Sequence, residues 1–329
     1  MNLIPDNVTT LDGNPLLGRL EGGYWLEVIR HLQLQMREDF NNYKFLFHSL
    51  QTHAKPDIAE HADSSAVLIV LGDNSGEHFV DHFKNFRVVF KVHLADSLEH
   101  VYPVPLGYTN MHLHGSTESV IDRPRNVFYS GNINAHRVDL WRALYFKHTW
   151  PKPNIRSRLI RRGIVYGVRK MNLANSFHQV FEDSYVNFTS GFAAGLDAEE
   201  YTRCLNESKI SLSPFGFGRA ECFRHFESMR SGCIVISDRL PETWYFKGSP
   251  IIQIPQWSSL REVIHSLLSD EKKIQRLQEE TLGWWNDVCA PPAVAHYIAG
   301  KIATSIPPKE RLAALTSSQF IVKTHQQYQ

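Results

Sequence analysis

The sequence predicts an α/β protein of two doubly wound domains. Its 329 residues correspond to about two domains, at the usual roughly 100 to 200 residues per domain. Hydrophobic residues make up 43% of the chain and charged residues 21%, a globular composition that excludes disorder. Short runs rich in β-branched and aromatic residues alternate with segments of helical period. This alternation is typical of βαβ units around a parallel sheet.

The first half of the sequence shows this alternation in part. It predicts a helix at about 24–38 and strands at 43–50, 65–73 and 86–93. The next segment, 101–110, contains Pro103 and Pro105, which lack the backbone N–H that a central strand donates. We therefore interpret this segment as an extended exit from the first domain.

The second half shows the complete alternation. Strands are expected at residues 127–132, 185–192, 209–214, 233–238 and 250–254. Helices are expected at about 136–148, 197–208, 220–231, 257–269 and 271–287. Asp197 is a candidate N-cap for the second of these helices, and Gly232 ends the third.

The domain boundary is expected near 110–125, in the polar stretch STESVIDRPRN. This assigns residues 1–118 to an N-terminal domain, 119–305 to a C-terminal domain and 306–329 to a tail. The tail after Pro307 has weak periodicity, so partial disorder and packing against the first domain both remain open.

Charge, apolar runs and cysteines exclude several classes of protein. The formal net charge of +1 offers no overall attraction to nucleic acid. The longest apolar run, near 65–71, is far shorter than the roughly 20 residues that span a bilayer. The first residues lack the basic and apolar regions of a secretory signal, so a cytoplasmic location is expected. Four cysteines without CxxC spacing indicate reduced thiols.

The segment 211–238 carries the clearest sign of a ligand site. A predicted strand ends in a loop with Gly216 and Gly218, a helix begins, and a buried strand follows. Such a loop offers free N–H groups to a phosphate. In the helix, Glu221, Arg224 and Glu227 are spaced three apart and share one face. An arginine there suits a diphosphate, and a carboxylate can accept from both hydroxyls of a ribose.

Each of these features also has a simpler interpretation. The three charged residues could form ion pairs on a solvated helix face. A second phosphate-loop candidate, residues 130–137, would present backbone N–H groups and Arg137, but an ordinary strand-to-helix turn has the same pattern.

The stretch SPFGFGRAECFRHFESMRSGCIVISD resembles the donor-binding segment of GT-B glycosyltransferases, most closely the exostosin-like type, glycosyltransferase family 47. The matching residues are Pro214, Gly216, Gly218, Arg224, Glu227, Met229, Gly232, Cys233 and Ile234. Weaker similarities lie at 101–108 and 128–132, and the resemblance covers about 100–270. It implies the GT-B fold of two facing Rossmann-like domains, the N-terminal one short and on the acceptor side.

The resemblance also implies roles for individual residues. Arg224 is implied to bind the donor diphosphate and Glu227 the ribose of a sugar nucleotide. The donor-binding residues are expected to be Arg137, Ser213, Gly216, Gly218, Arg224 and Glu227. Retaining GT-B enzymes often carry two glutamates eight positions apart, and the position eight before Glu227 is Arg219. Inversion is therefore expected.

No metal cofactor is expected. The chain has no Asp-x-Asp, and arginines with a helix N-terminus can neutralise the leaving group instead. The 17 histidines, among them His112, His114, His48, His53 and His61, show no recognised metal-ligand spacing. We interpret them as scattered core and surface residues.

An inverting transfer needs a base for the acceptor hydroxyl. Asp73 follows the apolar strand near 66–71 and is the first candidate, with Glu77 second and His78 close behind. Asp-Asn-Ser-Gly is equally good turn chemistry, so a structural turn remains the alternative.

A basic run covers 152–170 and contains no acidic residue. Anionic lipid headgroups, a phosphorylated acceptor, a polyanionic glycan and a merely solvated helix face are all open as its environment. The near absence of interleaved aromatics argues against nucleic acid.

The expected activity is transfer of a sugar from a nucleotide-sugar donor to a glycan or glycolipid hydroxyl. Two alternatives share the donor site. A nucleotide-sugar epimerase of the same fold needs no acceptor, and an inactive glycosyltransferase-like subunit binds without turnover.

Overall fold

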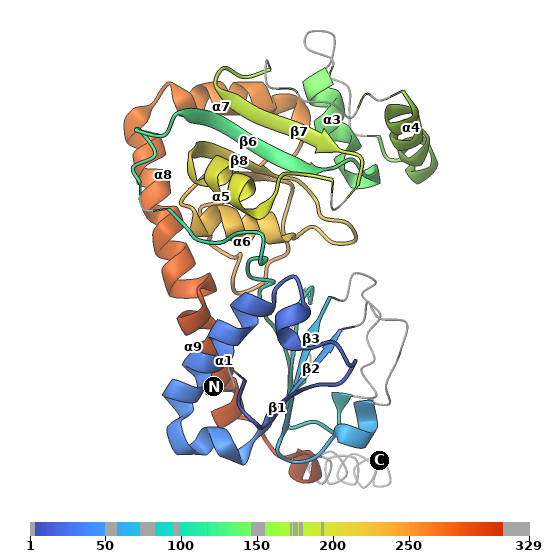
Figure 1. Cartoon of the computed structure of the whole chain (residues 1–329), viewed down its shortest axis with the longest axis vertical. Coiled ribbons are helices and arrows are strands. Elements are labelled where there is room, and N and C mark those ends of the chain that lie inside the picture. Colours follow the sequence, from blue (N-terminus) through green and yellow to red (C-terminus); the bar gives the residue numbers. More distant parts are fainter. Residues whose placement is uncertain are drawn as a thin grey trace, which may run out of the picture. The chain divides into compact units, whose positions relative to one another are not determined.

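The computed structural model describes residues 4–49, 58–72, 83–94, 99–116, 118–145, 155–171, 173, 177, 180–191 and 194–311 (Figure 1). Contacts divide the chain into two compact units, Met1–Pro105 with Pro291–Gln329, and Leu106–Ala290. Each unit holds a five-stranded sheet, and every strand pair in both sheets is parallel. The predicted fold class of two parallel-sheet α/β domains is therefore confirmed.

The first unit is built on five strands in sequential order. They are β1 (Val8–Thr10), β2 (Lys44–Ser49), β3 (Ala66–Leu71), β4 (Val88–Lys91) and β5 (Val101–Pro103). β3 is apolar and buried along its whole length, as expected of a strand that is covered on both faces. The proline-containing strand β5 lies at the edge of the sheet, so the prediction that it cannot be central is correct.

Two helices from opposite ends of the chain pack together in this unit. They are α1 (Gly22–Met36) and α9 (Pro291–Ala303) (Figure 1). Short 3₁₀ turns complete the described part of the unit at Leu16–Gly18, Arg37–Asn42 and Ile58–His61.

The second unit has the sheet order β10-β9-β8-β6-β7. Its strands are β6 (Arg125–Asn132), β7 (Ser184–Thr189), β8 (Ser208–Ser213), β9 (Ile234–Ser237) and β10 (Ile252–Gln253). Its helices are α3 (Val138–Tyr145), α4 (Arg158–Lys170), α5 (Ala198–Asn206), α6 (Phe223–Arg230), α7 (Leu260–Leu268) and α8 (Glu271–Trp284). A 3₁₀ turn at Ala135–Arg137 precedes α3, another at Trp257–Ser259 precedes α7, and a π-helical turn at Trp285–Cys289 follows α8.

Both faces of this sheet are covered. Successive side chains of a strand point to opposite faces, and those of β6 pack in two different clusters. Val127 and Tyr129 of β6 belong to the main core cluster, to which α3, α4, α7 and α8 also contribute. Phe128 between them packs instead with Cys204 and Leu205. Figure 1 shows α3 and α7 on one side of the sheet and α5 and α6 on the other.

The division of the chain differs from the expected one at both boundaries. The second unit begins at Leu106 rather than near 118, because the segment after Leu106 bonds to this unit: Thr109 donates to Glu227 (2.6 Å) and the N–H of Leu113 donates to Thr202 (3.0 Å). Arg123 in the polar stretch is also buried in this unit, and its guanidinium donates to the carbonyl oxygens of Ser208 (2.9 Å), Glu118 (3.0 Å) and Ser231 (2.7 Å). The segment from Pro291 onward, expected in the second domain, belongs to the first unit because α9 packs against α1.

The start of the C-terminal tail packs against the first unit. Arg87 donates to the hydroxyl of Ser305 (2.6 Å). Arg311 donates to the carbonyl oxygens of Lys84 (3.0 Å) and Phe86 (2.8 Å). Of the two alternatives left open by the sequence, packing is the one observed as far as Arg311.

The helices in the described part of the chain include none that combines the length and apolar character needed to cross a membrane.

Candidate functional site

The strand order of the second unit marks one position at the edge of its sheet. The chain leaves β6 toward β7 on one side, whereas β8, β9 and β10 follow one another on the other side. In open parallel sheets, ligands bind at the carboxyl ends of the strands where the order reverses in this way. The candidate site therefore lies beside the loops that follow β6 and β8.

The loop after β6 is held by the side chain of Asn134. Its Oδ1 accepts hydrogen bonds from the backbone N–H groups of His136 (2.9 Å) and Arg137 (3.2 Å). This cap begins a 3₁₀ turn that places Arg137 against both loops. The Arg137 guanidinium donates to Asn132 Oδ1 (2.7 Å) and to the carbonyl oxygen of Phe215 (3.1 Å), which follows β8.

The loop after β8 folds back on itself. The N–H of Gly216 donates to the carbonyl oxygen of Arg219 (2.9 Å). A Cβ on Gly216 would lie 2.7 Å from the carbonyl oxygen of Glu221, so only glycine fits there. Gly218 is half-buried in the same loop. Ser213 ends β8 and is buried, and its hydroxyl has no hydrogen-bond partner among the described residues.

Arg224 reaches from the first turn of α6 to the end of β6. Its Nη2 donates to the carbonyl oxygen of Ser130, and its guanidinium lies 4.9 Å from the ring centroid of Tyr129. A Cβ on Gly131 would lie 2.8 Å from Arg224 Nη2 and 3.1 Å from Arg137 Nη1. The two guanidinium groups therefore meet beside Gly131.

Two buried arginines meet here without an ion pair to any described residue. Arg137 is 6% exposed and Arg224 is 9% exposed, and neither forms an ion pair in the described part of the chain. Arg224 Nε and Nη1 and the hydroxyl of Tyr129 are buried without hydrogen-bond partners there. Buried polar atoms are normally hydrogen-bonded, so these donors are available to an acceptor from a ligand.

The protonation of Arg224 is secure despite its burial. Burial alone would lower the pKa of this guanidinium, but Tyr201 and Cys222 raise the pKa above its ordinary value. The positive charge therefore persists throughout the range in which proteins fold. An arginine in this state presents donors in a planar fork that matches a phosphate.

Glu227, one turn further along α6, is 2% exposed and held from two sides. Its Oε1 accepts from the N–H (3.1 Å) and the hydroxyl (2.6 Å) of Thr109. Its Oε2 accepts from the hydroxyl of Tyr201 on α5 (2.6 Å). A carboxylate has about four acceptor positions, so about one position on Oε2 is left.

A thiol and an imidazole lie together where α6 begins. Cys222 Sγ is 3.4 Å from His225 Nδ1, and His225 Nε2 is 2.7 Å from the hydroxyl of Ser237 at the end of β9. Burial would raise the pKa of the Cys222 thiol, but His225, Arg224 and Arg137 together lower that pKa to about 6. The pKa of His225 rises, since its interactions with Cys222 exceed the opposing effect of burial.

The structure separates the predicted site residues into two groups. Arg137, Ser213, Gly216, Gly218, Arg224 and Glu227 all lie in the loops and helix at this edge of the second sheet. Asp73, Glu77 and His78 lie outside the described residues. Glu221 precedes α6 rather than lying on it, is buried, and accepts a hydrogen bond from the hydroxyl of Tyr245 (3.0 Å). Burial of these charged residues excludes the solvated-face interpretation.

Sequence reasoning missed several residues of this arrangement. Gly131 lies within the predicted phosphate loop at 130–137. A glycine in such a loop lets the backbone approach a ligand closely, so its presence there was a usable signal. Tyr129, Tyr201 and Thr109 gave no signal, because an alternating strand, an ordinary helix and a linking segment all tolerate such residues. Their roles depend on contacts between distant parts of the chain.

His48, His61, His112 and His114 lie within the described residues, whereas His53 lies outside them. The described residues include no group of three or more His, Cys, Asp or Glu side chains that could hold an ion. His112 is buried with Nε2 2.9 Å from the hydroxyl of Ser231. Burial and the neighbouring charge of Arg230 lower the pKa of His112 to about 3, so it stays neutral.

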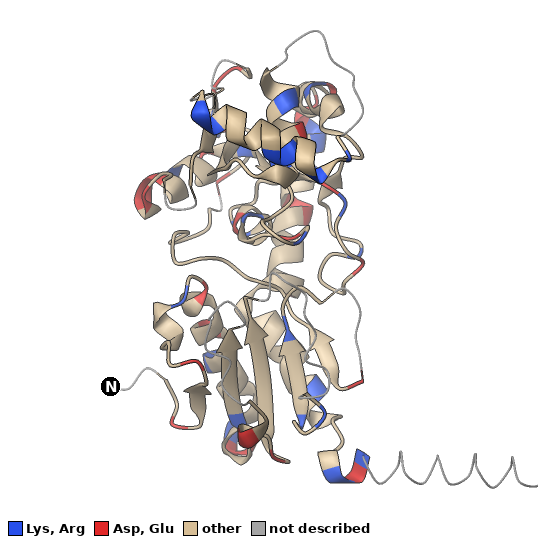
Figure 2. Cartoon of the chain, turned by 90° about the vertical axis from the view of Figure 1, so that its right-hand side faces the viewer, with Lys and Arg blue, Asp and Glu red and all other residues tan. Residues whose placement is uncertain are grey.

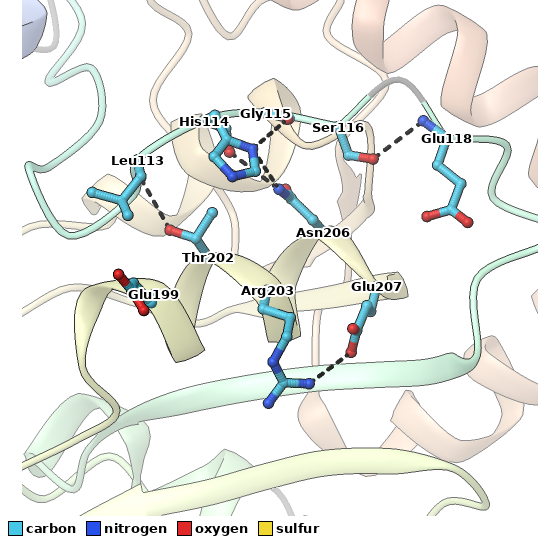
Figure 3. A pocket seen from close by; sticks show the side chains of 10 residues that line it. All are labelled: Leu113, His114, Gly115, Ser116, Glu118, Glu199, Thr202, Arg203, Asn206 and Glu207. Carbon is cyan, nitrogen blue, oxygen red and sulfur yellow. Dashed lines mark hydrogen bonds and ion pairs between the residues drawn. The ribbon is translucent and has the colours of Figure 1, made fainter.

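A separate pocket of about 780 Å³ lies between residues 113–118 and α5 (Figure 3). Most of its polar side chains already have partners. Thr202 accepts from the N–H of Leu113 (3.0 Å), Asn206 donates to the carbonyl oxygen of His114 (3.2 Å), and Arg203 pairs with Glu207 (3.2 Å). These contacts fasten residues 113–114 to α5, and no described residue lining the pocket is a buried arginine like those beside Gly131.

This chain resembles known proteins only weakly. No protein-family model and no curated protein matches it. Sucrose-phosphate synthase from Thermosynechococcus elongatus is similar in structure, with 12% identity, a TM-score of 0.46 and coverage of 87% of this chain and 77% of that chain. An alpha-glucosyltransferase solved with UDP and a 13-mer DNA has 12% identity, a TM-score of 0.47 and coverage of 84% of both chains. HepE from Anabaena, solved with UDP-glucose, has 12% identity, a TM-score of 0.47 and coverage of 84% and 82%. The function is therefore inferred from the residues around Gly131, not from these similarities.

Proposed function

We propose that the chain is a GT-B glycosyltransferase that binds the diphosphate of a nucleotide sugar beside Gly131. The observation that carries this proposal is the pair of buried arginines, Arg137 and Arg224, which meet at the switch point of the sheet and form no ion pair among the described residues, while Arg224 Nε and Nη1 lack hydrogen-bond partners there. A diphosphate supplies negative charge and the acceptors for Arg224 Nε and Nη1. The exostosin-like sequence around Arg224 supports the same ligand class.

Glu227 is the proposed ribose contact. Thr109 and Tyr201 hold its carboxylate in one orientation and occupy about three of its four acceptor positions. The remaining position on Oε2 accepts from a ribose hydroxyl. Orientation by neighbouring residues lowers the entropy that the ligand contact costs.

The proposed reaction is a single displacement at the anomeric carbon. The acceptor oxygen forms a bond to that carbon as the bond from the carbon to the diphosphate oxygen breaks. Arg137 and Arg224 stabilise the charge that develops on the diphosphate, so no metal ion is required. A base takes the proton of the acceptor hydroxyl, and Asp73 remains the first candidate for it, with Glu77 second.

Inversion and a glycan or glycolipid acceptor belong to the same proposal. Inversion is supported by Arg219, which stands where retaining enzymes of this fold often carry their first glutamate. The exostosin-like resemblance supports a saccharide hydroxyl as acceptor.

Product analysis tests the activity. The full chain is incubated with nucleotide sugars in the presence of EDTA, with and without saccharide acceptors. The products are identified by mass spectrometry, and their anomeric configuration is determined by NMR. The proposal predicts acceptor-dependent release of nucleoside diphosphate and a product of inverted anomeric configuration. An epimerised donor formed without acceptor would identify an epimerase, and binding without turnover under any acceptor would identify an inactive subunit.

A further inference from the structure

The helix α4 carries the described part of the basic run and packs on only one of its sides. Val168 is buried and Ile164 and Val165 are partly buried against the main core cluster of the second unit. Arg161, on the same side, pairs with Asp139 and donates to the carbonyl oxygen of Ala135 (2.8 Å). These contacts fix which faces of the helix turn outward.

The outward side of α4 exposes large apolar side chains. Leu159 is 79% exposed and Tyr166 is 66% exposed, and Ile160 and the C-cap residue Met171 are exposed as well. Twelve large hydrophobic residues are exposed in the described part of the chain, and four of them lie in this one short segment. Scattered single residues of this kind are ordinary on protein surfaces, but such a concentration marks a binding surface.

Cations flank these apolar side chains. Arg156, Arg158, Arg162 and Lys170 are exposed, and residues 155–171 contain no Asp or Glu. Arg161–Asp139 is the only ion pair that this segment forms with the described residues. Figure 2 faces this side of the chain and shows the basic segments of α4 in blue.

The spacing separates the two kinds of side chain into neighbouring strips. Leu159, Tyr166 and Lys170 recur at helical intervals along the outermost strip, with Gly163 between them. Arg158, Arg162 and Arg169 follow the strip on one side. Ile160 and Met171, eleven positions apart, lie on the opposite side. The helix thus has an apolar outer band with a cationic border over a length of about 20 Å.

We propose that α4 binds an anionic membrane surface and lies in the plane of the lipid headgroups. Helices that lie in this position have apolar side chains that enter the headgroup boundary and Lys or Arg that contact anionic lipids. Nucleic acid would satisfy the cations but leave Leu159, Ile160 and Met171 in water. A membrane surface buries the apolar side chains and pairs the cations with anionic headgroups. It also brings a lipid-linked acceptor within reach of the protein.

Vesicle co-sedimentation of the full chain tests the proposal. Phosphatidylcholine vesicles with and without phosphatidylglycerol are compared at low and high salt. Three double variants are measured beside the original chain: Arg158→Glu with Arg162→Glu, Leu159→Ser with Ile160→Ser, and the control Lys247→Glu with Lys272→Glu. The control changes the net charge by the same amount as the first variant, at exposed positions away from α4.

The proposal predicts binding only to the vesicles that contain phosphatidylglycerol, with affinity that falls as salt rises. Both α4 variants should lose at least about tenfold in vesicle affinity, whereas the control should lose much less. Equal binding to neutral vesicles, an equal loss in the control, or no vesicle binding at all would overturn the proposal. Salt-dependent binding to duplex DNA in place of vesicles would identify a nucleic-acid surface instead.

Folding and nucleotide binding serve as independent checks. Each variant should keep the melting temperature of the original chain, because all substituted side chains are exposed. Affinity for nucleoside diphosphate should also stay unchanged in the α4 variants. Failure of vesicle binding would therefore leave the proposed function intact, and failure of nucleotide binding would leave the membrane proposal intact.

Discussion

The hydroxyl of Thr109 donates a 2.6 Å hydrogen bond to Glu227, 118 positions later in the chain. Tyr201, on a different helix, donates to the other oxygen of the same carboxylate. The segment that begins the second unit, α5 and α6 are therefore joined at one buried charge. Any ligand that uses Glu227 meets a carboxylate whose orientation is already set.

Removal of this carboxylate should affect both stability and ribose recognition. Glu227→Gln should lower the free energy of unfolding by about 1 to 3 kcal/mol, since buried donors lose part of their partner. It should weaken UDP binding more than inorganic pyrophosphate binding, because only UDP has a ribose. Calorimetric titration of both ligands measures the difference.

Glu221→Gln is the matched control for Glu227→Gln. Glu221 is also buried and also accepts from a tyrosine hydroxyl, that of Tyr245. The control should lose stability but keep the ratio of the two affinities. If Glu227→Gln weakened UDP and pyrophosphate equally, Glu227 would be a structural anchor without a ribose contact.

Arg224 should contribute more than charge to anion binding. Arg224→Ala should weaken nucleoside diphosphate binding by at least about tenfold, as expected for the loss of charge-assisted hydrogen bonds. Arg224→Lys should recover only part of the affinity, because lysine lacks the planar fork of donors. Arg276→Ala removes an exposed arginine as a control and should bind normally. Full affinity in Arg224→Ala would remove this residue from the site.

A side chain at position 131 should weaken nucleotide binding. The methyl group of Gly131→Ala would lie 2.8 Å from Arg224 Nη2 and displace the guanidinium. We expect at least about a tenfold loss of nucleotide affinity with little change in melting temperature. Gly283→Ala, where a Cβ meets nothing within 4 Å, is the control. Unchanged nucleotide affinity in Gly131→Ala would show that the ligand binds elsewhere.

Cys222 should react with alkylating agents at lower pH than the other thiols. Its pKa of about 6 leaves it mainly as thiolate above that pH, so its alkylation rate should level off near neutral pH. Burial raises the pKa values of Cys204, Cys233 and Cys289, which serve as internal controls. Peptide mapping by mass spectrometry after brief iodoacetamide treatment gives the four rates.

A bound diphosphate should also slow the alkylation of Cys222. Its negative charge would offset the charges of Arg224 and Arg137, which lower the pKa of the thiol, so a smaller fraction of Cys222 would be thiolate. A Cys222 rate that keeps rising above pH 8, as for an ordinary thiol, would contradict the proximity of these charges.

Much of the fold could be predicted because local pattern and tertiary structure agree. The apolar run of β3 and the helical period of α5, with Asp197 as its cap, follow from short-range rules. The three-residue strand β1 could not be predicted, since it exists only through pairing with β2. The boundary at Leu106 was hidden because the contacts that set it, such as that of Thr109 with Glu227, join residues 118 positions apart.

The candidate site was predictable where it depends on a glycine loop followed by a helix. That pattern located Arg224 and Glu227. It could not show that Arg224 meets Arg137 beside Gly131, because Arg137 follows β6 and Arg224 follows β8, and these two strands are adjacent only in the sheet. Nor could it show that Tyr201 and Thr109 already donate to most of the acceptor positions of the Glu227 carboxylate.

The most direct test of the central claim is a thermal-shift measurement of the full chain with UDP, GDP, CMP, ADP and dTDP in EDTA. A nucleotide at 100 times its dissociation constant adds roughly 2.7 kcal/mol of stability, which a melting curve detects. The account predicts stabilisation by at least one of the four nucleoside diphosphates without a metal ion, and loss of that stabilisation in Arg224→Ala. No stabilisation by any of these four, or an equal shift in Arg224→Ala, would contradict a nucleotide diphosphate site beside Gly131.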